Sequence, residues 1–150
     1  DGKHVLVEAL AAWGRRQKRD LLRDLTAAAG TAEVTDLFVR LAGALPPSAE
    51  GDSTVRFDVR IWGEALGQPD LESVVRESLA DFQRLIAEHA EDLQREGRMR
   101  TDVEAETVAH VMVSLLTGLE LQLAFDSSLD RKDYIAAVGM LLGGLRPGGP

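Results

Sequence analysis

Histidine is the residue type in this sequence best suited to metal binding or acid–base chemistry, and it occurs three times, at His4, His89 and His110. The three fall on different predicted helices. No Glu-x-x-His pair is present, which disfavours a carboxylate-bridged di-metal bundle. Glu106 and His110 stand one helical turn apart and could share a metal ion, but the spacing is also that of a common side-chain pairing within a helix. We therefore predict no metal site.

The sequence also lacks the short motifs of the common enzyme classes. It contains no phosphate-binding P-loop, no dinucleotide-binding glycine fingerprint and no Gly-x-Ser-x-Gly nucleophile elbow. The absence of cysteine excludes disulfides, thiolate metal sites and cysteine nucleophiles. We predict that the protein is not an enzyme and uses no cofactor.

Polar side chains that interrupt apolar helix faces indicate a ligand-binding cavity instead. Asp58 falls beside Trp62 within one apolar arc, where an unpaired carboxylate would be costly to bury. Ser78 and His89 lie near the centre of the next apolar stripe. A salt bridge or helix-end hydrogen bond for Asp58, and a hydrogen-bonded core position for His89, are the structural alternatives. A few polar groups converging on an apolar lining are typical of small-molecule sites. The predicted effector-binding residues are Asp58, Trp62, Ser78, Phe82, His89, Met112 and Leu116.

Apolar periodicity along the chain predicts an all-α fold, a six-helix bundle-like domain over residues 1–150, with no strand. The expected helices cover residues 3–28, 31–45, 53–66, 70–96, 105–125 and 130–145. Gly30 and Gly97 are predicted stops, and Pro46-Pro47 ends the second helix. The predicted N-caps are Thr31, Ser53, Asp70 and Asp130. Residues 146–150 are expected to form a frayed tail.

The last two predicted helices, within residues 105–145, carry apolar residues on more than one side. The helix over 105–125 is apolar around most of its circumference, which predicts a central position. On the last helix, Leu141 is expected on one apolar face together with Val138 and Leu142, while Gly139 and Gly143 recur one turn apart on another face. Each glycine costs about 1 kcal/mol relative to alanine, so the pair indicates either a weak helix or close approach of another backbone.

We favour close approach, in an isologous four-helix interface with a second copy of the chain. The predicted contact residues are Ser114, Gly118, Leu121, Ala136, Gly139, Met140 and Gly143. Elsewhere, Phe57 and Leu66 are expected on a buried arc of the third helix together with Val55 and Ile61. Glu120 is a further pocket candidate, although we expect it at an exposed rim position.

The charge distribution bears on possible partners. A formal net charge of −8 opposes nucleic-acid binding by this segment, because such affinity comes largely from neutralising phosphates. The basic cluster of Arg15, Arg16, Lys18 and Arg19 is either a solvated helix face or a surface near DNA that a neighbouring domain binds. No signal peptide is recognisable, and the longest apolar run, residues 108–119, is too short to span a bilayer. We expect a cytoplasmic protein without a membrane partner.

Several segments resemble the C-terminal domain of TetR-family transcriptional regulators. They are residues 94–103, which separate two amphipathic runs, residues 60–65 and residues 116–119. Residues 1–10 are similar to the junction that follows the DNA-recognition helix and opens a connecting helix, here over residues 1–30. One departure is Glu104-Ala105, where the family often has Asp-Pro.

The resemblance implies a homodimeric sensor domain that binds a small hydrophobic effector. The DNA-binding helix-turn-helix domain would precede Asp1 and is absent from this chain, so DNA would be contacted only through that domain. In the family, the effector favours one arrangement of the sensor helices and shifts the connecting helix, so that the two DNA-reading heads no longer fit the operator. The protein would be a repressor. The alternative from another class is an all-helical dimeric interaction module without a small-molecule ligand.

Overall fold

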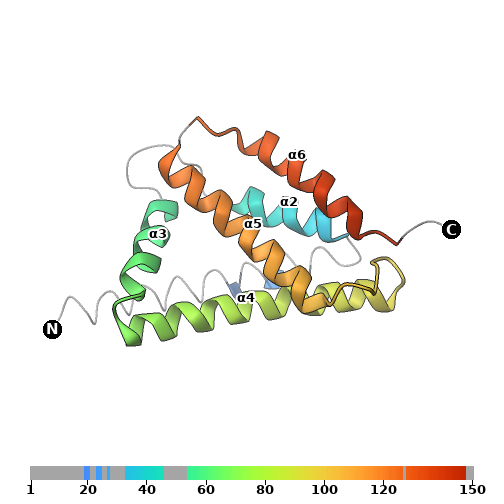
Figure 1. Ribbon diagram of the computed structural model, residues 1–150, viewed down its shortest axis with the longest axis horizontal. Coiled ribbons are helices and arrows are strands. Elements are labelled where there is room, and N and C mark those ends of the chain that lie inside the picture. The colour runs from blue at the N-terminus through green and yellow to red at the C-terminus, as the bar shows by residue number, and fades with distance from the viewer. Residues whose placement is uncertain are drawn as a thin grey trace.

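The computed structural model describes residues 19–20, 23–24, 27, 33–45, 54–126 and 128–147, and these are helices joined by turns (Figure 1). The all-α, bundle-like prediction is confirmed. The elements are α2 (Val34–Ala44), α3 (Thr54–Ala65), α4 (Pro69–Arg95), α5 (Ala105–Phe125), α6 (Arg131–Leu142) and the 3₁₀ turn η1 (Gly143–Leu145). The described part therefore contains five α-helices rather than six.

The difference in helix number lies at the N-terminal end. The expected connecting helix falls mostly outside the described residues, as do Arg15, Arg16 and Lys18 of the basic cluster. The described positions of that segment are helical. Arg19, the last member of the cluster, makes an ion pair with Asp81 of α4 at 3.8 Å.

The long helix α4 forms one edge of the molecule, and α5 crosses it (Figure 1). This pair makes the most extensive contact between elements, and α3 packs against both helices near the N-terminal end of α4. On the other side of α5 from α4 lie α2 and α6, and α6 packs mainly against α2. The expected central position of α5 is thus what the fold shows.

The main apolar core lies between α2, the C-terminal half of α4, α5 and α6. Its largest fully buried side chains include Phe38, Ile86 and Met112. A second small cluster, Ile61 with Leu71, joins α3 to the start of α4. By length and composition α5 could cross a bilayer. Half of its most apolar stretch is buried inside the domain, however, as expected of a core helix.

Two helix starts differ from the expectation. The N-cap of α4 is Gln68 rather than Asp70, because Pro69 begins the helix, where its missing N–H removes no hydrogen bond. Asp70 lies in the first turn, where a carboxylate is favourable next to the helix dipole. The N-cap of α2 is Glu33 rather than Thr31; its backbone N–H donates to the Asp36 carboxylate at 3.2 Å.

The start of α6 is as expected. The Asp130 carboxylate accepts hydrogen bonds from the backbone N–H groups of Lys132 and Asp133. The helix ends at Leu142 rather than Leu145, because Gly143–Leu145 tightens into a 3₁₀ turn. Ser53, the expected N-cap of α3, lies outside the described residues.

The C-terminal end of α4 is closed by Gly97, as predicted. The Arg98 N–H donates to the Leu93 carbonyl at 2.8 Å, and the Gly97 N–H donates to the Gln94 carbonyl at 3.0 Å. These two bonds form a Schellman motif, which requires the left-handed conformation that Gly97 adopts at φ 69°. The Gln94 side chain then donates to the carbonyls of Arg100 and Val103 and orders the rest of the turn.

Three burial predictions, for Phe57, Leu66 and Glu120, were wrong. Phe57 is 43 % exposed because it lies on nearly the opposite side of α3 from buried Val55, and Leu66 is 85 % exposed because α3 ends at Ala65. Leu141 does not share the buried side of Val138 and Leu142 but is exposed, because α6 packs against α2 along the line of those two residues. Glu120, expected at the rim, is buried because it follows Leu116 by one turn on the inward side of α5.

The Schellman turn predicts the effect of replacing Gly97. Gly97→Ala should lower the free energy of unfolding by about 1 kcal/mol, because an L-residue is strained in the left-handed region. A β-carbon there would meet no other residue within 4 Å, so the cost comes from local backbone strain and not from a clash with a neighbouring residue. Urea denaturation measures it. Gly43→Ala is the matched control, since its β-carbon is equally free but its backbone is helical, and it should stabilise by roughly 0.5 kcal/mol. Equal effects of the two substitutions would contradict this account of the turn.

Candidate functional site

The residues predicted to bind an effector lie on three helices that pack against one another. Asp58 and Trp62 are on α3, while α4 carries Ser78, Phe82 and His89. The remaining two, Met112 and Leu116, are on α5. Because α3 contacts both α4 and α5, and α4 contacts α5, the fold brings the three contributing elements together.

These side chains lie at different depths. His89, Met112 and Leu116 are buried, with at most 7 % of their surface exposed. Phe82 is half-buried and packs against the main core. Asp58, Trp62 and Ser78 are half-buried. The set therefore extends from the interior of the α4–α5 contact to the surface. That its members line one common cavity stays a prediction.

The polar groups among them are not isolated in the fold. His89 and Glu120 are the buried polar side chains among the described residues. Each of them, like Asp58, takes part in at least one polar, ionic or ring interaction, as the cost of burying an unpaired polar group requires. Glu120 is buried, although the sequence analysis placed it at an exposed rim position. Its four-residue spacing from Leu116 is the signal that could have placed it inward.

The possible metal pair on α5 has a local explanation. The His110 Nδ1 atom lies 2.7 Å from the backbone oxygen of Glu106, one turn earlier in the helix. The imidazole is exposed. Among the residues that the structure describes, no group of three or more His, Asp or Glu side chains is placed to hold a metal ion.

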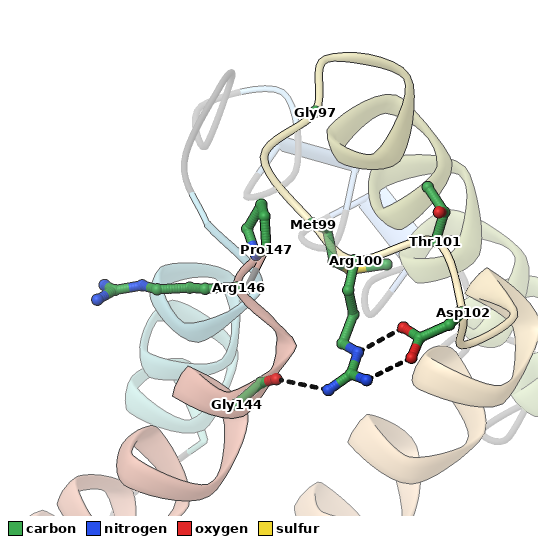
Figure 2. A pocket seen from close by; sticks show the side chains of 8 residues that line it. All are labelled: Gly97, Met99, Arg100, Thr101, Asp102, Gly144, Arg146 and Pro147. Atoms are coloured by element: carbon green, nitrogen blue, oxygen red, sulfur yellow. Dashed lines mark hydrogen bonds and ion pairs between the residues drawn. The ribbon is translucent and has the colours of Figure 1, made fainter. Parts of the chain in front are cut away.

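A separate hollow of about 550 Å³ lies between the α4–α5 turn and the C-terminal segment (Figure 2). Its lining residues are Gly97, Met99, Arg100, Thr101, Asp102, Gly144, Arg146 and Pro147. Apart from buried Met99 they are exposed, so the hollow is open to solvent, unlike the enclosed apolar sites that bind small molecules. None of the predicted effector-binding residues lines it.

Arg100 organises this hollow. Its guanidinium donates to both carboxylate oxygens of Asp102 and, from Nη1, to the Gly144 carbonyl at 3.4 Å. The hydrogen bonds and charge of Arg100 lower the pKa of the Asp102 carboxyl, and Asp102 raises the pKa of Arg100. Figure 2 shows Arg146 pointing away from Arg100, and its guanidinium pairs with Glu33 at 2.7 Å. Both arginines are thus paired with carboxylates.

The residues predicted to meet a second copy differ in exposure. Ser114, Leu121, Ala136 and Met140 are exposed, and the three glycines are partly covered. A β-carbon at Gly139 would lie 3.4 Å from the Thr35 Cγ2 atom of α2, and one at Gly118 would lie 3.9 Å from the Tyr134 Oη atom. The close neighbour of Gly139 therefore lies within the chain, and a β-carbon at Gly118 would make only an ordinary contact. A β-carbon at Gly143 would meet nothing within 4 Å.

Three large apolar side chains extend the exposed surface of α5 and α6 beyond the predicted set. Val111 and Phe125 on α5 are 48 % and 82 % exposed, and Leu141 on α6 is 73 % exposed. With Leu121 and Met140 they make up what we call the α5–α6 apolar face. The sequence indicates this face, because apolar residues occur on more than one side of both helices and a single chain buries only one side of each.

Comparison with known families decides what kind of domain this is. The model of the BetI-type transcriptional repressor C-terminal domain, a TetR C-terminal family, matches residues 36–146. The chain belongs to this family. No curated protein and no solved structure matches the chain significantly.

The match to the BetI-type repressor domain begins in α2 and ends just after η1. It includes all of the predicted effector-binding residues and the whole α5–α6 apolar face. The resemblance to TetR-family regulators inferred from the sequence is thereby confirmed, and with it the assignment to transcription regulation.

The Arg100–Asp102 pair predicts how the turn of this BetI-type domain responds to acid. Because the folded-state pKa of Asp102 is lowered, the pair stabilises the fold above the ordinary carboxyl value of about 3.9, and this contribution is lost as the pH falls through the folded value. Carbon-13 NMR should show Asp102 titrating below its ordinary range, and Arg100→Gln should raise its midpoint. Asp126 is the control, because Ser128 lowers its pKa, so its midpoint should not move. An Asp102 midpoint that is unchanged by Arg100→Gln would refute the pairing.

Proposed function

We propose that this chain is the effector-sensing and dimerisation domain of a TetR-family repressor that a small hydrophobic molecule releases from DNA. The observation that carries the proposal is α5, a core helix of a BetI-type repressor domain that nevertheless leaves the large apolar side chains of Val111, Leu121 and Phe125 exposed. In this proposal the protein is a cytoplasmic homodimer without catalytic activity. With a net charge of −8, the domain would leave DNA contact to a separate helix-turn-helix domain.

The α5–α6 apolar face supports the homodimer. Of the eight large apolar side chains exposed in the described part of the chain, five lie on α5 and α6. Exposed apolar patches mark protein interfaces. A two-fold arrangement would place each face against its own copy, so that one patch is covered by an identical one. Four helices, two from each chain, would then bury the outer side of α5.

The grouping of polar and apolar residues on α3, α4 and α5 supports the effector site. Trp62, Ser78 and Asp58 lie near the surface and could form an entrance, while Met112 and Leu116 lie at the interior end. An effector that binds there would act through its different affinity for two arrangements of these helices. The Arg19–Asp81 ion pair would carry a shift of α4 to the connecting segment.

A second candidate is a dimeric interaction module without an effector. It is favoured by the interactions that His89, Glu120 and Asp58 already make, since each of these groups has a partner within the chain. The two functions share the dimer and differ only in small-molecule binding.

The dimer is tested by placing a charge on the α5–α6 apolar face. Leu121→Glu should raise the dimer dissociation constant about 100-fold or more, because the substitution occurs twice and each buried leucine is worth about 1.5–3 kcal/mol. Analytical ultracentrifugation measures the constant. Leu66→Glu is the control, since Leu66 is 85 % exposed but lies after α3. A wild-type chain that is monomeric at all concentrations, or equal effects of both variants, would contradict the proposed interface.

The effector site is tested with the neutral apolar dye N-phenyl-1-naphthylamine. We expect saturable binding of one dye per chain and a raised melting temperature, because the dye binds only the folded state. Trp62→Ala should weaken binding about tenfold through lost apolar contact. Phe57→Ala, which removes an exposed aromatic ring from the same helix, should leave it unchanged.

The dye experiment also separates the two candidate functions. Binding that survives Leu121→Glu but is weakened by Trp62→Ala places the dye in the effector site. If no saturable binding is found, or if only Leu121→Glu abolishes it, the interaction module without an effector is favoured.

A further inference from the structure

The two helices of the α5–α6 apolar face make few direct contacts with each other. Along its length α6 packs against α2, and α2 in turn contacts α5 (Figure 1). The inward stripe of α6 is narrow, since only Val138 and Leu142 are buried in this helix. The orientation of α6 relative to α5 therefore depends on α2 and on contacts at the two ends of α6.

At the N-terminal end of α6 the contact is made by Tyr134. Its hydroxyl donates to the Leu115 carbonyl of α5 at 2.9 Å. Gly118 lies beside the phenol, and a β-carbon there would make ordinary van der Waals contact with the Tyr134 Oη atom at 3.9 Å. This contact fixes the start of α6 against the middle of α5.

At the C-terminal end of α6 the contact is made by Arg100. Its backbone N–H donates to the Leu145 carbonyl at 3.0 Å, and its guanidinium donates to the Gly144 carbonyl at 3.4 Å. These carbonyls follow the end of α6, where a cationic group is favourable because of the helix dipole. Figure 2 shows the guanidinium between Gly144 and Asp102, which holds it from the opposite side.

The part of the chain that carries Arg100 is itself well ordered. The Schellman motif at Gly97 and the two hydrogen bonds from the Gln94 side chain fix the turn to α4. The turn leads directly into α5 at Ala105. Arg100 thus joins the end of α6 to the rigid junction of α4 and α5.

We propose that Arg100, oriented by Asp102, is the positioning residue that sets the angle between α5 and α6 and so the geometry of the dimer face. The role in dimer geometry rests on the proposed homodimer, whereas the effect on the angle is a property of one chain. Loss of the guanidinium would leave the end of α6 held by the Arg100 backbone N–H and by α2. The C-terminal end of α6 would then sample a wider range of positions relative to α5.

The absence of cysteine allows a direct test by pulsed electron paramagnetic resonance. Spin labels on Thr107→Cys in α5 and Ala137→Cys in α6, both exposed positions, report the separation of the two helices. Labelled chains are diluted into unlabelled chains so that only distances within a chain are measured. Arg100→Gln should broaden the distance distribution and raise the dimer dissociation constant roughly 3- to 10-fold, the range for one hydrogen bond.

Three variants separate positioning from a general loss of stability. Arg98→Gln is the matched control, since Arg98 lies in the same turn but its ion pair is with Glu96, and it should change neither readout. Asp102→Asn should broaden the distribution less, and adding it to Arg100→Gln should have no further effect, because Asp102 acts through Arg100. Arg100→Lys, which keeps a cation near Gly144, should restore part of the narrow distribution.

An unchanged distance distribution in Arg100→Gln would overturn the proposal. If Arg100→Gln does not fold, the distance distribution of Arg100→Lys is compared with that of the wild-type chain instead. An unchanged distribution in Arg100→Lys would then overturn the proposal. A monomeric wild-type chain whose distribution still broadens in Arg100→Gln would refute the homodimer but leave the positioning role intact. A normal dimer with an unchanged distribution would refute the positioning role alone.

Discussion

The packing of α5 is the constraint on which the rest of the structure depends. The side of this helix that α4, α3 and α2 cover is apolar except for Glu120, and its outer side carries large apolar side chains among polar ones. Met112 and Leu119 are fully buried, whereas Val111 and Phe125 on the same helix are exposed. Large apolar side chains exposed on the outer side of a core helix favour a second set of partners. The first set is the rest of the chain, and in our proposal the second is another copy of the BetI-type repressor domain.

This arrangement links sensing to assembly through one element. The interior side of α5 carries Met112 and Leu116 of the proposed effector site, and its outer side carries Val111 and Leu121 of the α5–α6 apolar face. A change in how α4 packs on α5 would therefore alter both the proposed effector site and the α5–α6 apolar face, because a close-packed interior transmits small displacements. The turn that contains Arg100 adds a direct connection from the end of α4 to the end of α6.

Much of the fold could be predicted because its signals are local. The bounds of α5, the cap at Asp130 and the glycine stop at Gly97 follow from residue types at defined helix positions. The inward and outward directions on α3 and α6 could not be predicted as well. Leu141 and Phe57 are apolar but exposed, because which side of a helix is covered depends on neighbours that periodicity does not identify. Similarly, Gly139 accommodates Thr35 of α2, a contact between distant segments, and Arg100 could be recognised only once η1 was seen beside it.

The central claim, that a second copy covers the outer side of α5 and α6, is tested most directly by hydroxyl-radical footprinting over a range of protein concentrations. Phe125, Met140 and Leu141 are each more than 70 % exposed in the single chain. Our account predicts that they lose reactivity as the chain dimerises, while Phe57 and Leu66 on the α3 side stay reactive. If Phe125, Met140 and Leu141 keep their full reactivity at concentrations where the chain is dimeric, the account is contradicted.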